Sequence, residues 1–266
     1  MDLDLKGKAA IVTGGSRGIG KAIALGLAKE GANVAIVARD RAALDAARAE
    51  IVGATGVKVE AYSSDTGDDV AVRRMVAEAV SALGRIDILV NCAAQPGGQG
   101  KPPALGEITN EHFWADMNIK VMGYLRTSRE VAPHMIKAGS GRIIHVSGLA
   151  ARSTGTTIGS MRNVSVAALT KNMADELGPH GISVVCVHPG LTRTEKTPGV
   201  IAAQAKAQNL SEKEIETRMA GRNLVRKIIT AEEVADVVTF LASPKAVAIN
   251  GDAIAAGGGV PGVIHY

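Results

Sequence analysis

An α/β fold, with a parallel sheet wound by helices on both faces, is predicted by the alternation of two kinds of apolar segment. Short runs rich in β-branched residues alternate with longer stretches of helical periodicity. The 266 residues are 46% apolar, which suits one α/β domain with a large buried core. No internal repeat, low-complexity segment or interdomain linker interrupts the pattern. We therefore expect residues 1–266 to form a single domain.

The pattern predicts about seven strands with helices between them. The strands are expected at residues 9–13, 33–38, 57–62, 86–91, 142–147, 183–188 and 253–256. The helices are expected at residues 21–30, 41–52, 70–83, 110–137, 164–177 and 231–241. Sheets of this kind bind ligands at the carboxyl ends of their strands. One long irregular region, residues 190–230, follows such an end and contains a helical pattern near 211–219, so we predict a substrate lid there.

A glycine-rich turn joins the first predicted strand to the first predicted helix, in the sequence KAAIVTGGSRGIG at residues 8–20. A turn without Cβ atoms lets the backbone approach a diphosphate closely, and the next helix offers free N–H groups at its positive end. The order of strand, turn and helix favours a dinucleotide site over the alternative, an ordinary tight turn. The predicted contacts come from Gly14, Ser16, Arg17, Gly18, Ile19 and Gly20.

The second predicted strand ends in the sequence IVARD, where dinucleotide-binding folds usually place an acidic residue for the ribose hydroxyls. Ala38 stands at that point, and Arg39 follows it. A guanidinium with no carboxylate to repel a phosphate favours the 2′-phosphate of NADP(H), with Arg17 as a second positive contact. The alternative is NAD(H), with both arginines solvated and Asp40 reaching the ribose.

The charge and composition disfavour several other classes. The formal net charge is +4 and the pI about 9.1, but the basic residues are spread along the chain, so we predict no nucleic-acid binding. Cys92 and Cys186 lie in apolar runs and are expected to be small core residues; no disulfide and no metal site is predicted. No signal peptide and no apolar run of about 18 residues occurs, so we expect a cytoplasmic protein without a membrane segment.

Several motifs together resemble those of one family over essentially the full length of the chain. They are TGGSRGIG at 13–20, SSD at 63–65, GRIDILVNCAA at 84–94, MNIK at 117–120, GRIIHVSG at 141–148, ALTKNMADELGPHGISV at 168–184 and HPGLTRTE at 188–195. With them the chain resembles a classical short-chain dehydrogenase/reductase with a single Rossmann-type domain. The resemblance implies NAD(P)-dependent hydride transfer to or from a small carbonyl or alcohol substrate, in a homotetramer or homodimer.

The resemblance also implies individual cofactor contacts. Their expected sources are Asp65 and Thr66 beside the adenine, Asn91 and Ala93 in a stretch similar to the family's N-N-A-G, and the nicotinamide loop residues Pro189, Gly190, Thr192 and Thr194. Cys92 and Ala94 depart from the N-N-A-G pattern. The alternative for Asn91 is that it only ties strands together.

For the reaction itself, the resemblance points to a serine and an asparagine. Ser147 matches the serine that hydrogen-bonds the substrate carbonyl, and Asn118 matches the asparagine that holds a water in a proton relay. The alternatives are that Ser147 is an ordinary strand-end hydroxyl and that Asn118 merely bonds the helix backbone.

One family motif is missing, the Tyr-x-x-x-Lys pair on the helix after Ser147. The tyrosine passes the proton, and the lysine, one turn on, lowers the tyrosine pKa and bonds the nicotinamide ribose. Counting back from Lys171 places the lysine slot at Asn163 and the tyrosine slot at Gly159. Residues 155–166 contain no Tyr and no Lys, so no shift of register restores the pair. We expect a divergent member with an atypical active site.

Three interpretations of this departure are open. In the first, an oxidoreductase with Ser147 polarising the carbonyl takes its proton through Asn118, Asn163, a threonine of 154–157 or water. In the second, the protein binds the nucleotide without redox catalysis. In the third, Tyr266 of a neighbouring subunit acts in the site, although a frayed or interface-packing tail explains that end more simply. We favour the first, because Ser147, Asn118 and the nicotinamide loop serve little purpose in a protein that only binds.

Overall fold

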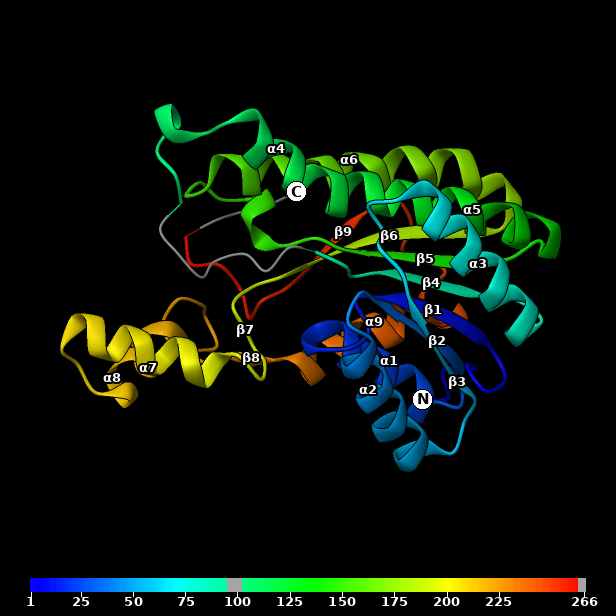
Figure 1. The fold of residues 1–266 in the computed structure, drawn as a ribbon, viewed down its shortest axis with the longest axis horizontal. Helices are drawn as coiled ribbons and strands as arrows, with labels where there is room; N and C mark the ends of the chain where they lie inside the picture. Colours follow the sequence, from blue (N-terminus) through cyan, green and yellow to red (C-terminus); the bar gives the residue numbers. More distant parts are fainter. Residues whose placement is uncertain (95–101, 263–266) are drawn as a thin grey trace.

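A seven-stranded parallel sheet forms the centre of the molecule (Figure 1). The computed structural model describes residues 1–94 and 102–262. The strand order is β3-β2-β1-β4-β5-β6-β9, and every neighbouring pair is parallel. The strands are β1 (Ala9–Thr13), β2 (Asn33–Ala38), β3 (Val59–Ser63), β4 (Ile88–Asn91), β5 (Gly141–Val146), β6 (Ile182–Pro189) and β9 (Ala253–Ala256). The order reverses between β1 and β4, which is where such sheets bind ligands.

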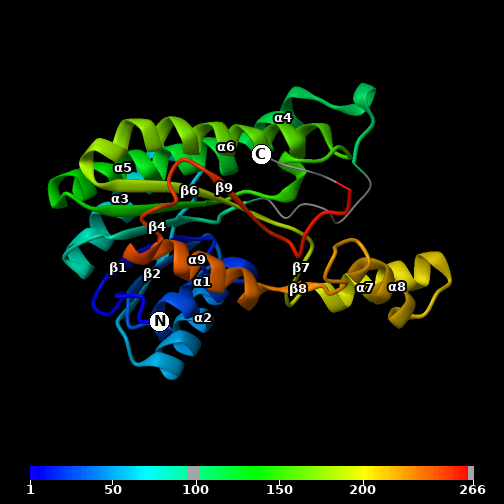
Figure 2. The same ribbon diagram turned by 180° about the vertical axis from the view of Figure 1, so that it is seen from behind.

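Helices cover both faces of the sheet, as Figures 1 and 2 show from opposite sides. One layer consists of α1 (Gly18–Lys29), α2 (Arg41–Thr55) and α9 (Ala231–Ala242); the other consists of α3 (Asp69–Leu83), α4 (Asn110–Met117), α5 (Gly123–Ala138) and α6 (Thr157–Leu177). Neighbouring residues of β1 serve the two layers in turn, because strand side chains alternate between faces. Val12 belongs to the same core cluster as Ile23 of α1, and Ile11 belongs to a second cluster with Val76 of α3. The predicted doubly wound α/β fold is confirmed.

Polar caps and glycines set the ends of α2 and α3. Asp40 accepts a hydrogen bond from the Ala43 amide at 3.1 Å before α2, and Asp68 caps α3 in the same way. Gly56 and Gly84 end these helices in the left-handed region, with φ of 71° and 77°. The residues that begin and end these two helices can therefore be recognised in the sequence.

The structure differs from the predicted elements in the layer that contains α4, α5 and α6. The helix predicted at 110–137 is divided, because residues Asn118–Met122 form a π-helical turn (η2) between α4 and α5. A search for 3.6-residue periodicity does not detect such an insertion. α6 begins at Thr157 and not at residue 164, because the Thr156 hydroxyl oxygen caps it by accepting from the Gly159 amide at 3.3 Å.

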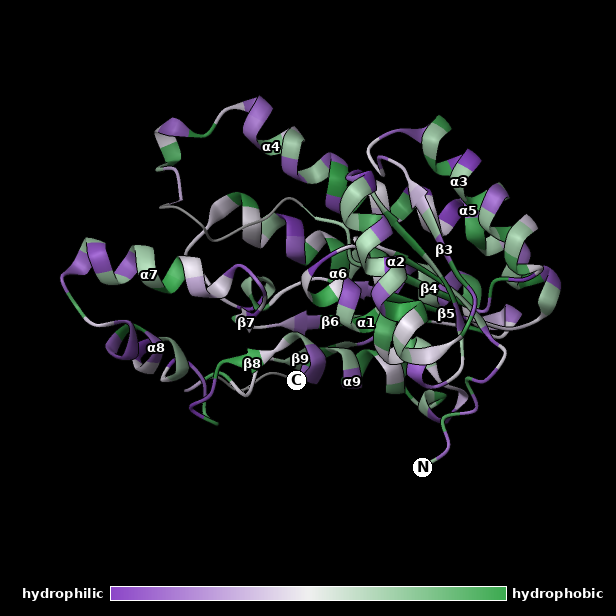
Figure 3. Cartoon of the chain, turned by 60° about the horizontal axis from the view of Figure 1, so that its bottom comes forward, coloured by the Kyte–Doolittle hydropathy of each residue, from purple (hydrophilic) through white to green (hydrophobic). Residues whose placement is uncertain are grey.

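A helical pair extends beyond the sheet between β6 and α9. It consists of α7 (Thr197–Gln208) and α8 (Glu212–Ala220), framed by the short parallel strands β7 (Thr192–Arg193) and β8 (Ile229–Thr230). The two helices and Ile228, just before β8, bury a small cluster of their own, whose other members are Ile201, Ala205, Ile215 and Met219. α8 matches the predicted helical pattern and is largely hydrophilic (Figure 3), whereas α7 was not predicted. Its alanines leave little apolar periodicity to read.

Three further features bear on the predicted class. Within residues 1–94 and 102–262, no helix combines the length and apolar character that crossing a membrane requires. In the same residues, no group of three or more His, Cys, Asp or Glu side chains is placed to hold a metal ion. Cys92 and Cys186 are both free thiols, and Cys186 is buried.

Candidate active site

The turn after β1 is closed so tightly that side chains do not fit at two of its glycines. A Cβ on Gly20 would lie 2.2 Å from the carbonyl oxygen of Gly14, and one on Gly14 would lie 3.0 Å from the backbone of Ala93. Gly14 also has a φ of +70°, which L side chains rarely adopt. Thr13 brings Ala93 there, since its hydroxyl oxygen accepts from the Ala93 amide at 3.2 Å. Backbone contact therefore dictates the glycine spacing.

The start of α1 presents backbone N–H groups beside this turn. The Gly18 amide donates to a carboxylate oxygen of Glu195 at 3.2 Å, so an anionic oxygen already lies at the positive end of the helix. Ser16 is half-buried in the turn, and Ile19 packs against the apolar core. A glycine cradle without room for Cβ atoms, next to an N–H group that takes an anionic oxygen, fits the diphosphate of a dinucleotide.

The two predicted phosphate-binding arginines lie at the exposed end of this cradle. Arg17 forms an ion pair with Asp40, and both side chains are about half exposed. Arg39 is exposed as well, and its carbonyl accepts from the Ser63 hydroxyl at 3.0 Å, which ties the end of β2 to that of β3. Asp40 therefore both caps α2 and forms the ion pair with Arg17.

The predicted adenine contacts lie in the loop after β3. The Asp65 carboxylate accepts from the Gly67 amide at 2.8 Å and so shapes its own loop. Thr66 is buried, and its carbonyl accepts from Arg126 at 3.3 Å. Neither bond tests a contact with adenine, which stays a prediction for both residues.

Asn91 is fully buried at the end of β4 and uses both ends of its amide within the protein. Its Nδ2 donates to Ser128 Oγ at 3.1 Å, and its Oδ1 accepts from Thr127 Oγ1 at 2.6 Å. These bonds tie β4 to α5. A role for Asn91 toward the cofactor stays a prediction.

The predicted nicotinamide loop follows β6 and crosses in front of the glycine turn. Thr192 Oγ1 donates to the Gly190 carbonyl at 3.1 Å, and the Thr194 amide donates to Thr197 Oγ1 at 2.9 Å. A Cβ on Gly18 would lie 3.4 Å from the Thr194 side chain. Pro189, the last residue of β6, is buried. The loop is thus brought directly against the start of α1.

Two of the residues predicted for the reaction, Ser147 after β5 and Asn163 of α6, are in direct contact. The Ser147 hydroxyl donates to the Asn163 backbone carbonyl at 3.1 Å, and both residues are buried. Asn163 Oδ1 has no hydrogen-bond partner among the described residues. A Cβ on Gly148 would lie 3.2 Å from Asn163 Nδ2. Tyr266, predicted to act from a neighbouring subunit, lies outside the described residues.

Gly159, the predicted tyrosine slot, is buried in the first turn of α6. A Cβ there would lie 2.6 Å from Cγ2 of Thr156, the residue that caps the helix. The amide of Gly159 is the donor to that cap. The tyrosine slot is therefore filled on one side by the capping threonine.

The π turn brings Lys120, not Asn118, to Ser147. Asn118 donates from Nδ2 to the Gly67 carbonyl at 3.4 Å and accepts from Arg126 Nη2 at 2.8 Å, which holds it against the loop after β3. Lys120 is 5% exposed, and its Nζ donates to the Ser147 carbonyl at 2.8 Å. The motif MNIK contained both residues, but only the π turn decides which of them faces Ser147. Sequence reasoning therefore missed Lys120.

The family model for short chain dehydrogenases matches residues 8–206. The chain is a short-chain dehydrogenase. It is 34% identical over 254 residues to the short-chain reductase protein NovJ of Streptomyces niveus, covering 95% of this chain and 93% of the relative. It is 33% identical over 258 residues to the 3-oxoacyl-[acyl-carrier-protein] reductase FabG of Thermotoga maritima, covering 96% and 98%. These findings confirm the predicted family and the predicted class of oxidoreductase.

Solved structures of other short-chain dehydrogenases share the fold. L-sorbose reductase of Gluconobacter frateurii, solved with NADPH and L-sorbose, has a TM-score of 0.92 and 30% identity, with 99% of this chain and 100% of that one covered. A short chain dehydrogenase of Burkholderia cenocepacia in complex with NADP has a TM-score of 0.81 and 34% identity, covering 96% and 98%.

Tyr124 is not placed to serve as the tyrosine that was predicted to be absent at Gly159 of this short-chain dehydrogenase. It is 1% exposed, and its hydroxyl donates to the Val146 carbonyl at 2.8 Å. Burial raises its pKa well above the ordinary value. The neighbouring His145 bonds Thr170 at 3.0 Å, and burial lowers its pKa to about 3, so it is neutral at pH 7. Both side chains belong to the core beneath the site.

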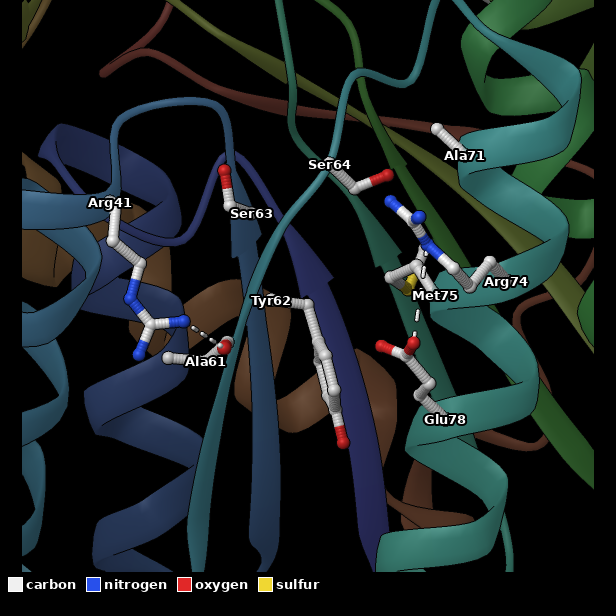
Figure 4. Close-up of a pocket in the computed structure, with 9 residues that line it drawn as sticks. All are labelled: Arg41, Ala61, Tyr62, Ser63, Ser64, Ala71, Arg74, Met75 and Glu78. Carbon is white, nitrogen blue, oxygen red and sulfur yellow. Dashed lines mark hydrogen bonds and ion pairs between the residues drawn. The ribbon is translucent and has the colours of Figure 1, made fainter.

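A separate pocket of about 220 Å³ lies beside the edge strand β3 (Figure 4). It is lined by Arg41, Ala61, Tyr62, Ser63, Ser64, Ala71, Arg74, Met75 and Glu78. Arg41 donates to the Ala61 carbonyl at 3.4 Å, and Arg74 pairs with Glu78 at 4.0 Å. The pocket contains neither the glycine turn nor Ser147, so we do not assign it to the reaction of this short-chain dehydrogenase.

Proposed function

We propose that the protein transfers a hydride between NADP(H) and a small carbonyl or alcohol substrate. The observation that carries this proposal is the glycine cradle, where backbone contacts exclude side chains beside an N–H group that takes a carboxylate oxygen. Membership in the family and the relatives named as reductases support it. When bound, the nicotinamide supplies or accepts the hydride, while residues of this chain bind, orient and handle the proton.

The choice of NADP(H) over NAD(H) rests on the two arginines at the cradle. Arg39 is exposed at the end of β2, and Arg17, in the glycine turn, pairs with the neighbouring Asp40. A 2′-phosphate offers both guanidinium groups a stronger partner than a ribose hydroxyl does. The structures of similar proteins with NADPH or NADP support this choice. Asp65, Thr66, Asn91 and Ala93 are proposed to enclose the adenosine side.

At the reaction end, we assign separate parts to four residues. Ser147 donates to the substrate carbonyl oxygen after exchanging its bond with the Asn163 carbonyl, and the buried Asn163 amide bonds the nicotinamide ribose. Gly159 adds no side chain to the tyrosine slot, which leaves the part that Thr156 does not fill for a bulkier substrate. Asn118, bonded to Arg126 and to the Gly67 carbonyl, is a positioning residue that fixes the π turn.

Residues 190–230 are proposed to form a lid on the substrate. The segment leaves the sheet through Pro189, Gly190, Thr192 and Thr194, the loop proposed to touch the nicotinamide, and returns through β8. Between these points α7 and α8 carry their own small core, so the pair is able to move as a unit.

A homodimer or homotetramer is proposed through the outer face of α4 and α6. Trp114, Met161 and Val164 are 60%, 49% and 50% exposed on these two helices. Apolar side chains of that size gathered on one face favour a protein partner. The two free thiols fit the proposed cytoplasmic location.

The competing function is nucleotide binding without redox chemistry, favoured by the absence of tyrosine and lysine at Gly159 and Asn163. Titration calorimetry with NADPH and NADH, followed by turnover of ketones, aldehydes and alcohols, separates the two. L-sorbose and a 3-oxoacyl thioester belong in that panel. We expect NADPH to bind more tightly than NADH, with slow oxidation of NADPH by some carbonyl compound. Tight NADPH binding with no turnover across the panel would favour the binding protein.

A further inference from the structure

Lys120 is buried beside Ser147, where the proposed reaction takes place. Its Nζ has one hydrogen-bond acceptor among the described residues, the Ser147 carbonyl at 2.8 Å. An ammonium group has three N–H donors, so two are left for water or a ligand. Burying a charge with so few partners costs stability. A lysine at this position therefore has no evident benefit for the stability of the fold.

The groups around Lys120 do not neutralise its charge. They are Asp116 of α4, Arg162 of α6, Cys92 after β4, and Cys186 and His188 of β6. Asp116 is already paired with Arg162, whose Nη1 donates to it at 2.6 Å. Burial raises the pKa of both thiols to about 11 and lowers that of His188 to about 4, so all three are neutral at pH 7.

Among the described residues, the positions predicted for the reaction after β5 and on α6 carry no acidic side chain. Gly148 and Gly159 contribute no side chain, and the Ser147 hydroxyl donates to a backbone carbonyl. Asn163 is 3% exposed, and its Oδ1 is a buried acceptor without a partner in the part of the chain that the structure describes. A buried ammonium with free donors and a buried amide with a free acceptor thus belong to two residues that both hydrogen-bond Ser147. Both are available to a polar ligand.

We propose that Lys120 is the proton donor of this short-chain dehydrogenase, in place of the missing tyrosine. The proposal rests on the function proposed above. As the carbonyl carbon receives its hydride, the Lys120 ammonium gives one proton to the carbonyl oxygen. One N–H bond breaks, one O–H bond forms, and a neutral amine remains, which regains a proton from water. In alcohol oxidation the neutral amine takes the hydroxyl proton.

The electrostatic surroundings support this role. Burial, followed by the nearby Arg162, lowers the pKa of Lys120 to about 8. A group with a pKa close to the working pH is protonated in a useful fraction of molecules and still gives up its proton readily. An ordinary exposed lysine holds its proton too firmly for that task.

The first experiment compares three variants for NADPH binding and for turnover of the best carbonyl substrate. We expect K120M and K120R to lower kcat by about 100-fold or more, with NADPH affinity changed less than about threefold. K171M removes an exposed lysine of α6 and should behave as the wild type. Arginine keeps the charge but does not release its proton. Normal turnover in K120R would therefore overturn proton donation, and normal turnover in K120M would overturn any role.

The second experiment measures the group directly in the full-length protein without cofactor. Labelled-lysine NMR should show Lys120 titrating near pH 8, with that signal absent in K120M. Since the ammonium is the required form, kcat for reduction should fall about tenfold per pH unit above that value. A Lys120 that titrates like the exposed lysines would refute the proposal. Failure of the wild type to bind NADPH would instead refute the proposed function, and the NMR titration still reports on Lys120.

Discussion

The glycine turn after β1 and the region around Ser147 lie at the same edge of one sheet, but their residue types are constrained in different ways. In the turn, Gly14 and Gly20 face backbone atoms at 3.0 and 2.2 Å, so the family's residues cannot be exchanged without moving the chain. Around Ser147, the slots predicted for the family's tyrosine and lysine hold Gly159 and Asn163. On the proposed function, cofactor binding is thus specified by backbone geometry, whereas proton transfer depends on side chains that another residue can replace.

The largest effect is expected from restoring the family's tyrosine and lysine near Ser147, which tests this contrast. We expect Gly159→Tyr with Asn163→Lys to raise generic ketone reduction by about 10²–10⁴-fold. Thr156→Ser should accompany them, because Thr156 Cγ2 would lie 2.6 Å from the new Cβ while the hydroxyl must still cap α6. Steady-state kinetics with NADPH and simple ketones provide the measurement. Intact NADPH binding without any gain in rate would mean that the two slots are placed wrongly.

In the glycine turn, by contrast, we expect position 20 to tolerate no side chain. Gly20→Ala puts a Cβ 2.2 Å from the Gly14 carbonyl oxygen, and overpacking of this kind costs about 3 kcal/mol. We expect NADPH affinity, measured by calorimetry, to fall by about 100-fold. Gly53→Ala is the matched control, since a Cβ there meets no atom within 4 Å. Equal behaviour of the two variants would contradict the idea of a backbone-specified cradle.

A smaller effect on NADPH binding is expected at Arg39, where a side chain is proposed to contact the cofactor. Arg39→Ala should weaken NADPH binding by about tenfold and leave NADH binding unchanged, because only the 2′-phosphate needs the guanidinium. Fluorescence titration with both nucleotides measures the difference. Arg41→Ala serves as the control, since Arg41 is engaged with Asp45 and with the Ala61 carbonyl. Equal losses for both nucleotides in Arg39→Ala would remove the phosphate assignment.

The smallest effect concerns the ion pair between Arg17 and Asp40. Asp40→Asn keeps the cap of α2, because asparagine is an equally good capping residue, but removes the charge that holds Arg17. Both side chains are half exposed, so we expect NADPH affinity to rise by no more than about threefold. Competition binding between wild type and variant would detect the change. A loss of affinity would show that Asp40 itself bonds the ribose.

The sequence was sufficient for the sheet and the cradle because their signals are local. The alternation of apolar segments and the spacing of Gly14, Gly18 and Gly20 are read directly along the chain. Lys120 was not predictable, because its burial depends on a π turn that adds a residue to a helix without changing its composition. The start of α6 was missed for a related reason: the Thr156 cap precedes a first turn with few apolar residues.

The π turn at Asn118–Met122 also fixes the rotational phase between α4 and α5. One residue corresponds to about 100° of rotation in an α-helix. The turn, which the Asn118 side chain helps to hold, therefore sets which face of α4 is exposed when α5 buries Tyr124. Trp114 is exposed and Lys120 is buried, although less than two helical turns separate them along the chain. The π turn therefore governs both the position of the proposed proton donor and the orientation of the proposed subunit interface.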